Sequence, residues 1–536
     1  MRRRSASKAR PSINRLVSSA GLLACAAAAA LADTYPRQPW VDAQHYVFRV
    51  TLSDDTDEIV GEATAEMLFL RDGEAEFALD LAAGMNVSAV TPSARFTHDA
   101  DRLIIRLRTP AKAGERQHFT IRYRGVPKSG LRIGANRYGE RTFFSLNWPN
   151  LARQWLPIID HPYDKATSEF LVTAPSKYTV VANGLLQEVI DLGDDRRITH
   201  WKQAVPIASW LNAIGVAQFA SRHFGSVKAI PLETWVYHQD LQAGIATFET
   251  PTRLAMEFFI DHIGPYPYEK LADVEAAGLG GGTEHASAIF FGERSVTDKP
   301  ATNLVAHEIA HQWFGDSVTE KDWDDVWLSE GFATYFTLLA TEHNEGREAF
   351  LGGLKRSRDN VFDLERRSPG IAVRHNNLSD MSKVLNRIVY EKGGWTLHML
   401  RGLMGTDKFW AGIREYYRRY RDANASTDDF RGVMEAQAGA DLKWFFDQWL
   451  NRVGSPVVDW SWRYDAGARK VVIDLAQTQP GEPYRLPVEI EVGDKIEKLE
   501  VTQKQQRFEI PEDEMPAAVV LDPHTWTLMY AKFGKQ

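Results

Sequence analysis

The segment of this chain best suited to bind a metal contains two histidines four residues apart. The run His307-Glu308-Ile309-Ala310-His311 places both imidazoles on one face of a helix, one turn apart. A third possible ligand, Glu330, comes after His311 with eighteen residues between them. Three protein ligands leave the fourth position of zinc for water, which is typical of a catalytic site. Glu308 lies beside the first ligand, where its carboxylate could take a proton from that water.

The same pattern could also belong to a surface helix with two solvated histidines. Bulky apolar residues surround the motif, however, at 304–306 and at Trp313-Phe314, so we expect the helix to be largely buried. Buried histidines and glutamates need partners, and a metal supplies them. The sequence therefore favours a zinc ion bound by His307, His311 and Glu330.

Length and composition indicate a globular protein of several domains. A chain of 536 residues is too long for a single core, and its 44% hydrophobic and 25% charged residues are ordinary for a globular protein. The formal net charge is −8, and no dense basic block follows the first thirty residues. Nucleic acid is therefore not an expected partner.

Residues 1–32 resemble an export signal. Basic residues up to Arg15 lie before an apolar, alanine-rich stretch, and Ala30-Leu31-Ala32 resembles a cleavage site. Six of the 63 Lys and Arg residues and none of the 71 Asp and Glu residues lie in this segment, so its removal would leave a net charge of −14. An uncleaved membrane anchor is the alternative, but the apolar stretch is short for a span. We expect an exported protein, periplasmic or secreted.

The only cysteine of the chain, Cys25, lies inside this segment. Leu22-Leu23-Ala24-Cys25 also resembles the lipobox of bacterial lipoproteins, so a lipid anchor at Cys25 is an alternative to cleavage after Ala32. In either case the rest of the chain forms no disulfide and offers no thiolate to a metal. We expect no transmembrane helix in the mature chain.

The apolar pattern divides the remaining chain into three parts, which together indicate a multidomain α+β protein. Alternation at 45–52, 62–70, 103–107 and 118–123 predicts an antiparallel β domain over 33–225. Apolar residues three and four apart predict a mainly helical domain over 226–453, with helices at 250–263, 303–314, 330–342, 383–403 and 407–420. Strand-like segments at 457–464, 471–475, 486–492, 496–501 and 518–521 predict a small β-sandwich over 454–536.

Further segments carry a resemblance to a known family. They are Gly281-Gly282-Thr283-Glu284-His285, Tyr390-Glu391-Lys392-Gly393-Gly394, Asn147-Trp148-Pro149, Val181-Ala182-Asn183-Gly184 and Gly264-Pro265-Tyr266-Pro267. With the zinc motif, they make the chain resemble a short bacterial-type gluzincin aminopeptidase, of the family of aminopeptidase N and leukotriene hydrolase. The resemblance covers nearly all of the chain beyond residue 32 and implies a thermolysin-like catalytic domain preceded by a β domain.

The resemblance also implies roles for single residues. His307, His311 and Glu330 match the ligands of one zinc ion, and Glu308 matches the general base. Glu284 matches the glutamate that holds the free α-amine of the substrate, and Tyr390 matches the tyrosine that stabilises the tetrahedral oxyanion. The implied activity is removal of the N-terminal residue from peptides with a free N-terminus.

The glycine-rich segment departs from the usual Gly-x-Met-Glu-Asn of that family. Thr283 stands in place of Met, where the first substrate pocket forms, and His285 stands in place of Asn. Gly281 and Gly282 are expected to lie beside the substrate with Glu284. His285 is either a second polar contact to substrate or a residue that fixes the loop. Asn147 is the nearest polar candidate for a second residue at the amine site.

Three other functions remain open. A zinc endopeptidase would share the metal motif, and an epoxide hydrolase would share the fold with the leukotriene branch. A binding scaffold that has lost its metal belongs to a different functional class. The presence of all three ligands, the base and the tyrosine argues against the scaffold.

Overall fold

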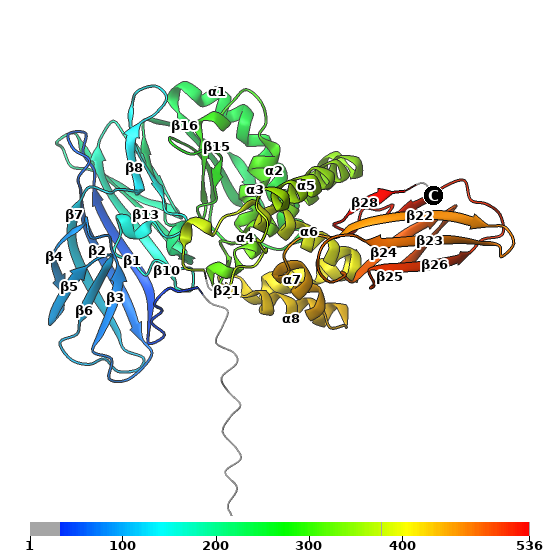
Figure 1. Ribbon diagram of the computed structural model, residues 1–536. Helices are drawn as coiled ribbons and strands as arrows, with labels where there is room; N and C mark the ends of the chain where they lie inside the picture. The colour runs from blue at the N-terminus through cyan, green and yellow to red at the C-terminus, as the bar shows by residue number, and fades with distance from the viewer. Residues whose placement is uncertain (1–32, 377, 535–536) are drawn as a thin grey trace, which may run out of the picture.

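The computed structural model describes residues 33–376 and 378–534. The expected export signal and Cys25 lie outside the described residues. A group of β-sheets from the N-terminal half and a β-sandwich from the C-terminal end lie at opposite ends of the molecule, with the helices between them (Figure 1). None of the helices in the described ranges combines the length and the hydropathy needed to cross a bilayer.

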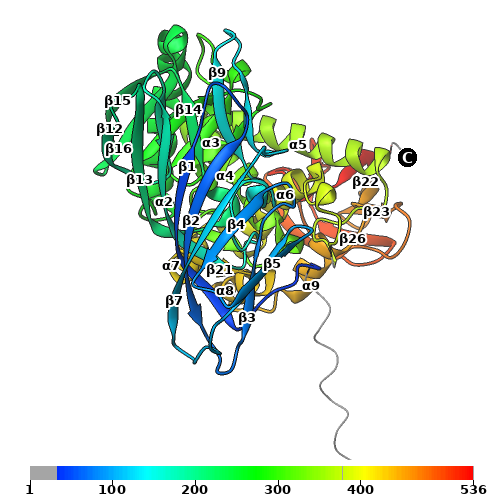
Figure 2. The ribbon, with the colours of Figure 1, turned by 90° about the vertical axis from the view of Figure 1, so that its left-hand side faces the viewer.

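The largest sheet has seven strands in the order β12-β13-β10-β1-β2-β7-β4. Strands β13, β1, β2, β7 and β4 of this sheet are labelled in Figure 2. In β2 every second residue from Ile59 to Phe69 is buried, which is the alternation that the sequence shows. All neighbours are antiparallel except β1 and β10, which run parallel. The strands are β1 (Val41–Thr51), β2 (Ile59–Phe69), β4 (Asn86–Thr91), β7 (Arg116–Gly125), β10 (Lys165–Pro175), β12 (Leu185–Asp191) and β13 (Arg196–Ala208).

Two smaller antiparallel sheets complete the N-terminal β region. One has the order β11-β14-β9-β8 and the other β3-β6-β5. A single core of buried apolar side chains, including Phe48, Phe119 and Phe144, joins them to the large sheet. Their strands are β3 (Glu76–Asp80), β5 (Arg95–Asp99), β6 (Arg102–Arg106), β8 (Gly130–Ala135), β9 (Arg141–Leu146), β11 (Thr179–Ala182) and β14 (Ile214–Ala217).

A mixed sheet of five strands, in the order β15-β16-β17-β19-β18, comes next. Its strands are β15 (Phe219–Val227), β16 (Ile230–Tyr237), β17 (Leu271–Ala276), β18 (Gly282–Thr283) and β19 (Ala288–Gly292). Strands β16, β17 and β19 are parallel, and α2 (Thr250–His262) connects β16 to β17. The helical pattern from 226 onward did not predict this sheet, and the boundary expected at 225 falls inside β15. All six residues of β17 are buried, so the strand lacks the alternation that marks a half-exposed strand.

The remaining helices pack together beside this sheet. The five predicted helices are confirmed as α2, α3, α4, α6 and α7, with ends that differ by a few residues, whereas α5 and α8 were not predicted. Gly331 of α4 and Gly393 of α6 bring these two helices into close contact. The bounds are α1 (Leu241–Gly244), α3 (Thr302–His311), α4 (Trp327–Glu345), α5 (Arg347–Arg367), α6 (Arg387–Met404), α7 (Thr406–Tyr420), α8 (Thr427–Ala438) and α9 (Lys443–Phe446).

Short elements position the start of α4. Strand β20 (Val318–Glu320) pairs in parallel with β21 (Ala423–Ala425), which ties the segment after α3 to the connection between α7 and α8. A 3₁₀ turn, η6 (Trp323–Asp325), then leads directly into α4. These links hold α3 and α4 in a fixed relation.

The C-terminal strands form two sheets, as predicted. Their orders are β26-β23-β22-β28 and β25-β24-β27. Buried residues of β23 and β24, including Ile473 and Ile490, belong to the same core as the helices. The strands are β22 (Val457–Asp465), β23 (Lys470–Gln477), β24 (Leu486–Val492), β25 (Lys495–Val501), β26 (Gln505–Pro511), β27 (Val519–Leu521) and β28 (Tyr530–Phe533).

Candidate metal centre

The side chains of His307, His311 and Glu330 converge at the contact between α3 and α4. The two Nε2 atoms lie 3.3 Å apart, and Glu330 Oε2 lies 3.5 Å from His307 Nε2 and 3.3 Å from His311 Nε2. Zinc with bonds of about 2.0–2.2 Å in a tetrahedron holds its ligand atoms roughly 3.3–3.5 Å apart. Within the described ranges, this is the single group of three His, Cys, Asp or Glu residues with such convergent ligand atoms. The donor set fits zinc in both chemistry and spacing.

A second set of contacts orients His311. Its Nδ1 donates to the carbonyl oxygen of Phe314 at 3.2 Å and lies 3.0 Å from Ser329 Oγ. With the proton on Nδ1, the lone pair of Nε2 faces the other two ligands. Gly315 makes this arrangement possible: its φ is +116°, and a Cβ there would lie 2.3 Å from Ser329 Oγ.

The electrostatics of the site favour a cation. Burial alone would lower the pKa of His311, but the carboxylates of Glu284 and Glu330 raise it well above its usual value. Burial alone would raise the pKa of Glu330, but His311 and His307 lower it to about 2. Glu330 is therefore an anion, and its Oε2 has no hydrogen-bond partner within the described ranges. A metal ion would satisfy that oxygen.

Tyr390 comes to this centre from α6. Its hydroxyl donates to Glu330 Oε1 at 2.9 Å. Burial and then the Glu330 carboxylate raise the pKa of Tyr390, so the phenol keeps its proton and can donate it in a hydrogen bond. A Cβ on Gly331 would lie 2.9 Å from the carbonyl carbon of Gly393, so the helix contact that brings Tyr390 close depends on glycine.

Glu308 lies against the glycine-rich segment. It is 5% exposed, and burial followed by the neighbouring Glu284 charge raises its pKa well above the usual value. A Cβ built on Gly282 would lie 2.3 Å from Glu308 Cδ. Gly281, by contrast, has open space at the same position. Because Gly282 has no side chain, it leaves the space that the Glu308 side chain occupies.

Glu284 is a second buried carboxylate of the centre, 6% exposed. Its carboxylate makes no hydrogen bond or ion pair with another side chain in residues 33–376 and 378–534. Burial raises its pKa, while the nearby His311 acts in the opposite direction. A positively charged group bound beside it would compensate this carboxylate.

Gln312, which directly follows the candidate ligand His311, holds the backbone around Glu284. Its Nε2 donates to the carbonyl oxygen of Glu284 at 3.0 Å and to Asp316 Oδ2 at 2.7 Å. Its Oε1 accepts from the backbone of Ser287 at 2.9 Å and from the hydroxyl of Tyr266 at 3.0 Å. The sequence patterns did not point to Gln312. A glutamine next to a buried candidate ligand nevertheless needs hydrogen-bond partners, and this could have marked it.

The N-terminal β region fixes the other end of the same loop. Asn183 Nδ2 donates to the carbonyl oxygen of Ala286 at 2.7 Å, and the backbone of Gly184 donates to Ser287 Oγ at 2.7 Å. The buried Lys270 Nζ donates to the carbonyl oxygen of Ser287 at 2.9 Å. The loop that carries Glu284 is thus held by both the β region and the helices.

Comparison with known proteins agrees with this geometry. Residues 255–449 match the Peptidase family M1 domain, and residues 44–211 match the Peptidase M1 N-terminal domain. Together these matches, of 195 and 168 residues, cover more than half of the 536-residue chain. The chain belongs to the M1 peptidase family.

The curated relatives of this M1 peptidase include glutamyl aminopeptidases. Glutamyl aminopeptidase of Rattus norvegicus is 28% identical over 353 residues, which is 62% of this chain and 37% of the relative. Tricorn protease-interacting factor F2 of Thermoplasma volcanium is 27% identical over 57% of this chain and 40% of its own length. The chain thus spans less than half of the length of these curated relatives.

A solved structure confirms the fold of the M1 peptidase. The crystal structure of an M1 zinc metallopeptidase from Deinococcus radiodurans has a TM-score of 0.68 and 25% identity, and covers 78% of this chain and 95% of that one. The family implies zinc, and the His307, His311 and Glu330 donor set is compatible with it.

Thr283 and His285, the two departures in the glycine-rich segment, occupy different surroundings. Thr283 lies in β18, paired with Phe290, and is 9% exposed. His285 is fully buried, with its ring edge-on to Phe290 at 4.7 Å between centroids. Burial lowers the pKa of His285 to about 3, so the ring is neutral. Of the two interpretations of His285, this position favours loop packing over contact with substrate.

Asn147 does not fit its expected place at the amine site. It is fully buried in the N-terminal β region. Its Nδ2 donates to the carbonyl oxygen of Asn212 at 2.6 Å, and its Oδ1 accepts from Trp155 Nε1 at 2.9 Å. A peptide has no access to a side chain at this depth, so Asn147 is a structural residue. Asn147 was the nearest polar candidate in its segment, but the sequence does not show that both ends of its side chain are already hydrogen-bonded inside the fold.

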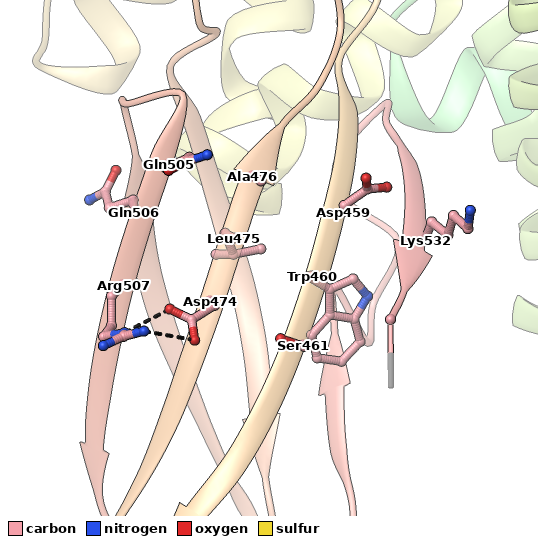
Figure 3. A pocket seen from close by; sticks show the side chains of 11 residues that line it. Asp459, Trp460, Ser461, Asp474, Leu475, Ala476, Gln505, Gln506, Arg507 and Lys532 are labelled. Atoms are coloured by element: carbon pink, nitrogen blue, oxygen red, sulfur yellow. Dashed lines mark hydrogen bonds and ion pairs between the residues drawn. The ribbon is translucent and has the colours of Figure 1, made fainter. Parts of the chain in front are cut away.

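Two hollows lie outside the buried centre. One, of about 380 Å³, is lined by Tyr390 together with Thr334, Asn386, Arg387 and Glu391, and so lies beside the side chain that contacts Glu330. The other, of about 610 Å³, lies on the C-terminal sandwich (Figure 3). There Asp474 pairs with Arg507 at 2.7 Å, and the lining contains no histidine. The hollow on the sandwich therefore offers no histidine ligand to a metal.

Proposed function

We propose that this M1 peptidase is a zinc aminopeptidase that removes the N-terminal residue from peptides. One zinc ion per chain would be held by His307, His311 and Glu330. The observation that carries the proposal is Glu284: a buried carboxylate with no side-chain partner among the residues that the structure describes, held beside the three candidate metal ligands by Gln312. An α-ammonium is the substrate group that such a carboxylate would bind.

Charge balance supports the same substrate class. Glu284, Glu308 and Glu330 are three nearly buried carboxylates, and the site's two histidines are both ligand candidates. A divalent cation and the ammonium of a free N-terminus would together supply the missing positive charge. A blocked N-terminus would leave Glu284 buried and uncompensated, which is costly.

Each residue has a distinct task in the proposed reaction. Zinc would supply a Lewis acid that polarises the scissile carbonyl and lowers the pKa of water. Glu308 takes the proton of the attacking water and passes it to the leaving amine. The Tyr390 hydroxyl donates to the carbonyl oxygen as negative charge develops there. Glu284 holds the ammonium so that only one residue lies between it and the bond that is cut.

We also propose that the chain is exported, with cleavage between Ala32 and Asp33. Lipidation at Cys25 would give a different first residue and is the alternative. After the signal we propose three domains. The first boundary lies at about residue 218, just before β15 of the five-stranded sheet, and the second lies at 454, before the C-terminal sandwich. Peptides with a free N-terminus are the proposed partners, and nucleic acid is not.

Hydrolysis of matched substrates tests the function. A panel of aminoacyl-arylamides should be cleaved, the N-acetylated forms should resist, and a chelator should abolish turnover until zinc is restored. Glu308→Gln should retain its zinc, as measured by atomic absorption, while its kcat should fall by about 10²–10⁴-fold. Efficient cleavage of acetylated peptides at internal bonds would instead indicate an endopeptidase, and a zinc-free active protein would contradict the metal assignment.

A further inference from the structure

The first described residue, Asp33, is buried against the catalytic region. It is 8% exposed, and its backbone nitrogen donates to Asp322 Oδ1 at 2.8 Å. Its Oδ2 accepts from the backbone of Trp323 at 3.2 Å and lies 2.7 Å from His161 Nε2. Its Oδ1 accepts from the backbone of Tyr35 at 3.0 Å. A residue in a loose terminal tail would not have this density of contacts.

The charges around Asp33 do not balance. Asp33 and Asp322 share one guanidinium, because Arg37 Nη2 lies 2.6 Å from Asp322 Oδ2 and 3.5 Å from Asp33 Oδ1. Burial lowers the pKa of His161, so its ring adds no full charge at neutral pH. Burial and then the Asp33 charge raise the pKa of Asp322 to about 6. Two carboxylates with one cation leave the cluster one positive charge short.

The missing charge can come from the backbone nitrogen of Asp33 itself. The predicted cleavage site ends at Ala32, so processing there would convert this nitrogen from an amide into an amine. An α-amine has a pKa of about 7.7–8.0 in water, and an adjacent carboxylate raises it. The nitrogen already lies at hydrogen-bond distance from Asp322 Oδ1.

We propose that processing between Ala32 and Asp33 creates a buried ion pair between the α-ammonium of Asp33 and the carboxylate of Asp322. A processing endopeptidase adds water across the Ala32–Asp33 amide, which leaves a carboxylate on Ala32 and an amine on Asp33. The amine takes a proton from solvent and pairs with Asp322. The inference rests on the proposed export and is independent of the peptidase reaction.

The ion pair would stabilise the segment that carries Glu330. Asp322 caps η6 by accepting from the backbone of Asp324 at 3.2 Å, and η6 runs directly into α4. The Asp33 carboxylate at the same time contacts His161 of the N-terminal β region. Processing would therefore lock the β region to the start of the helix that supplies a metal ligand.

The first test is the N-terminus of the exported full-length chain, determined by intact mass and N-terminal sequencing. The proposal requires Asp33 as the first residue. A lipidated start at Cys25, or any other start, overturns it. This result does not depend on whether the protein hydrolyses peptides.

The second test measures the ion pair by its dependence on the free amine. Asp322→Asn is made in a chain that starts at Asp33 and in a chain that keeps residues 29–32 ahead of it. We expect Asp322→Asn to lower the melting temperature of the processed chain by about 3 °C or more beyond its effect in the chain that keeps residues 29–32. Asp194→Asn, at an exposed pair with Arg196, should act equally in both chains. Equal losses from Asp322→Asn in the two chains overturn the proposal.

Amine reactivity gives a readout that needs no variant. In the processed wild type, acylation of the Asp33 amine near neutral pH should be at least tenfold slower in the native protein than in the unfolded one. Exposed lysines of the same sample serve as the internal reference. Labelling at the unfolded rate means that the amine is free in solvent and contradicts the ion pair.

Discussion

At the scale of single residues, three carboxylates with the same chemistry have different surroundings. The histidines lower the pKa of Glu330 to about 2, whereas burial raises the pKa of both Glu284 and Glu308. Glu330 is therefore suited to bind a metal. Glu308 is suited to exchange a proton, and Glu284 to meet a cation from the substrate.

The sequence predicted these residues better than it predicted those that hold them. The spacing of His307, His311 and Glu330 is a local property of two helices, and the structure brings the three together. The bonds of Gln312 join segments up to 46 residues apart in the chain, so no local pattern reveals them. The hydrogen bonds that Asn147 makes with Trp155 and with the carbonyl oxygen of Asn212 were likewise not visible in the local pattern.

Gly282 allows a test of the room that Glu308 needs. In Gly282→Ala the new methyl group would lie 2.3 Å from Glu308 Cδ, which is a clash, so the Glu308 side chain must move. We therefore expect kcat to fall by about tenfold to a hundredfold. Gly280→Ala is the matched control, because a Cβ there also faces open space and Gly280 is not among the residues expected beside the substrate, and its kcat should stay within about twofold of the wild type. Steady-state kinetics on a free-amine substrate decides, and equal effects of the two changes would refute the packing argument.

Gln312 should act through Glu284. Gln312→Met keeps the volume but loses the bond to the Glu284 carbonyl, so kcat/KM for free-amine substrates should fall by about tenfold or more. Zinc content should be unchanged, and the preference for free over acetylated substrates should shrink. A loss of stability with that preference intact would show that Gln312 is only structural.

At the scale of elements, alternation and helical spacing were reliable where one face of an element is exposed. Strands β1, β2 and β7 and helices α2 and α7 were found in this way. The parallel sheet was missed because β17 is buried at every position. Helix α5 was missed although Phe350, Leu354 and Val361 follow a helical spacing, because charged residues dominate the rest of that segment.

The contact between α4 and α6 yields a prediction about stability. Gly331→Ala would place a methyl group 2.9 Å from the backbone of Gly393, so the helices must separate at a cost of about 1–3 kcal/mol. Gly352→Ala, in the interior of α5, meets only an arginine end at 3.5 Å and should be neutral or stabilising. Denaturant midpoints compare the two, and a neutral Gly331→Ala would disprove the close contact.

At the scale of the whole molecule, the metal centre lies where separate parts of the fold meet. The β region holds the Glu284 loop through Asn183, and α6 brings Tyr390 to Glu330. The same helix reaches the C-terminal sandwich: Lys392 Nζ lies 3.1 Å from Glu365 Oε1 and donates to the carbonyl oxygen of Gly454 at 2.5 Å. Such contacts between domains have no counterpart in local sequence patterns.

Lys392 should therefore secure the attachment of the sandwich. Lys392→Met leaves Glu365 without its cation, and we expect a loss of about 3–5 kcal/mol in the free energy of unfolding together with faster proteolysis near residue 454. Lys443→Met removes an exposed pair with Asp447 and serves as the control, with no comparable change. Thermal unfolding and limited proteolysis of both variants provide the comparison.

The most direct test of the account is how Glu284 changes the ratio of kcat/KM for a free-amine peptide to that for its N-acetylated form. The wild type should strongly favour the free amine. Glu284→Ala should keep its zinc and lose about 10²–10³-fold in kcat/KM for the free-amine peptide, while the acetylated peptide changes little. If the ratio is the same in Glu284→Ala as in the wild type, Glu284 does not read the substrate amine, and the aminopeptidase assignment loses its main support.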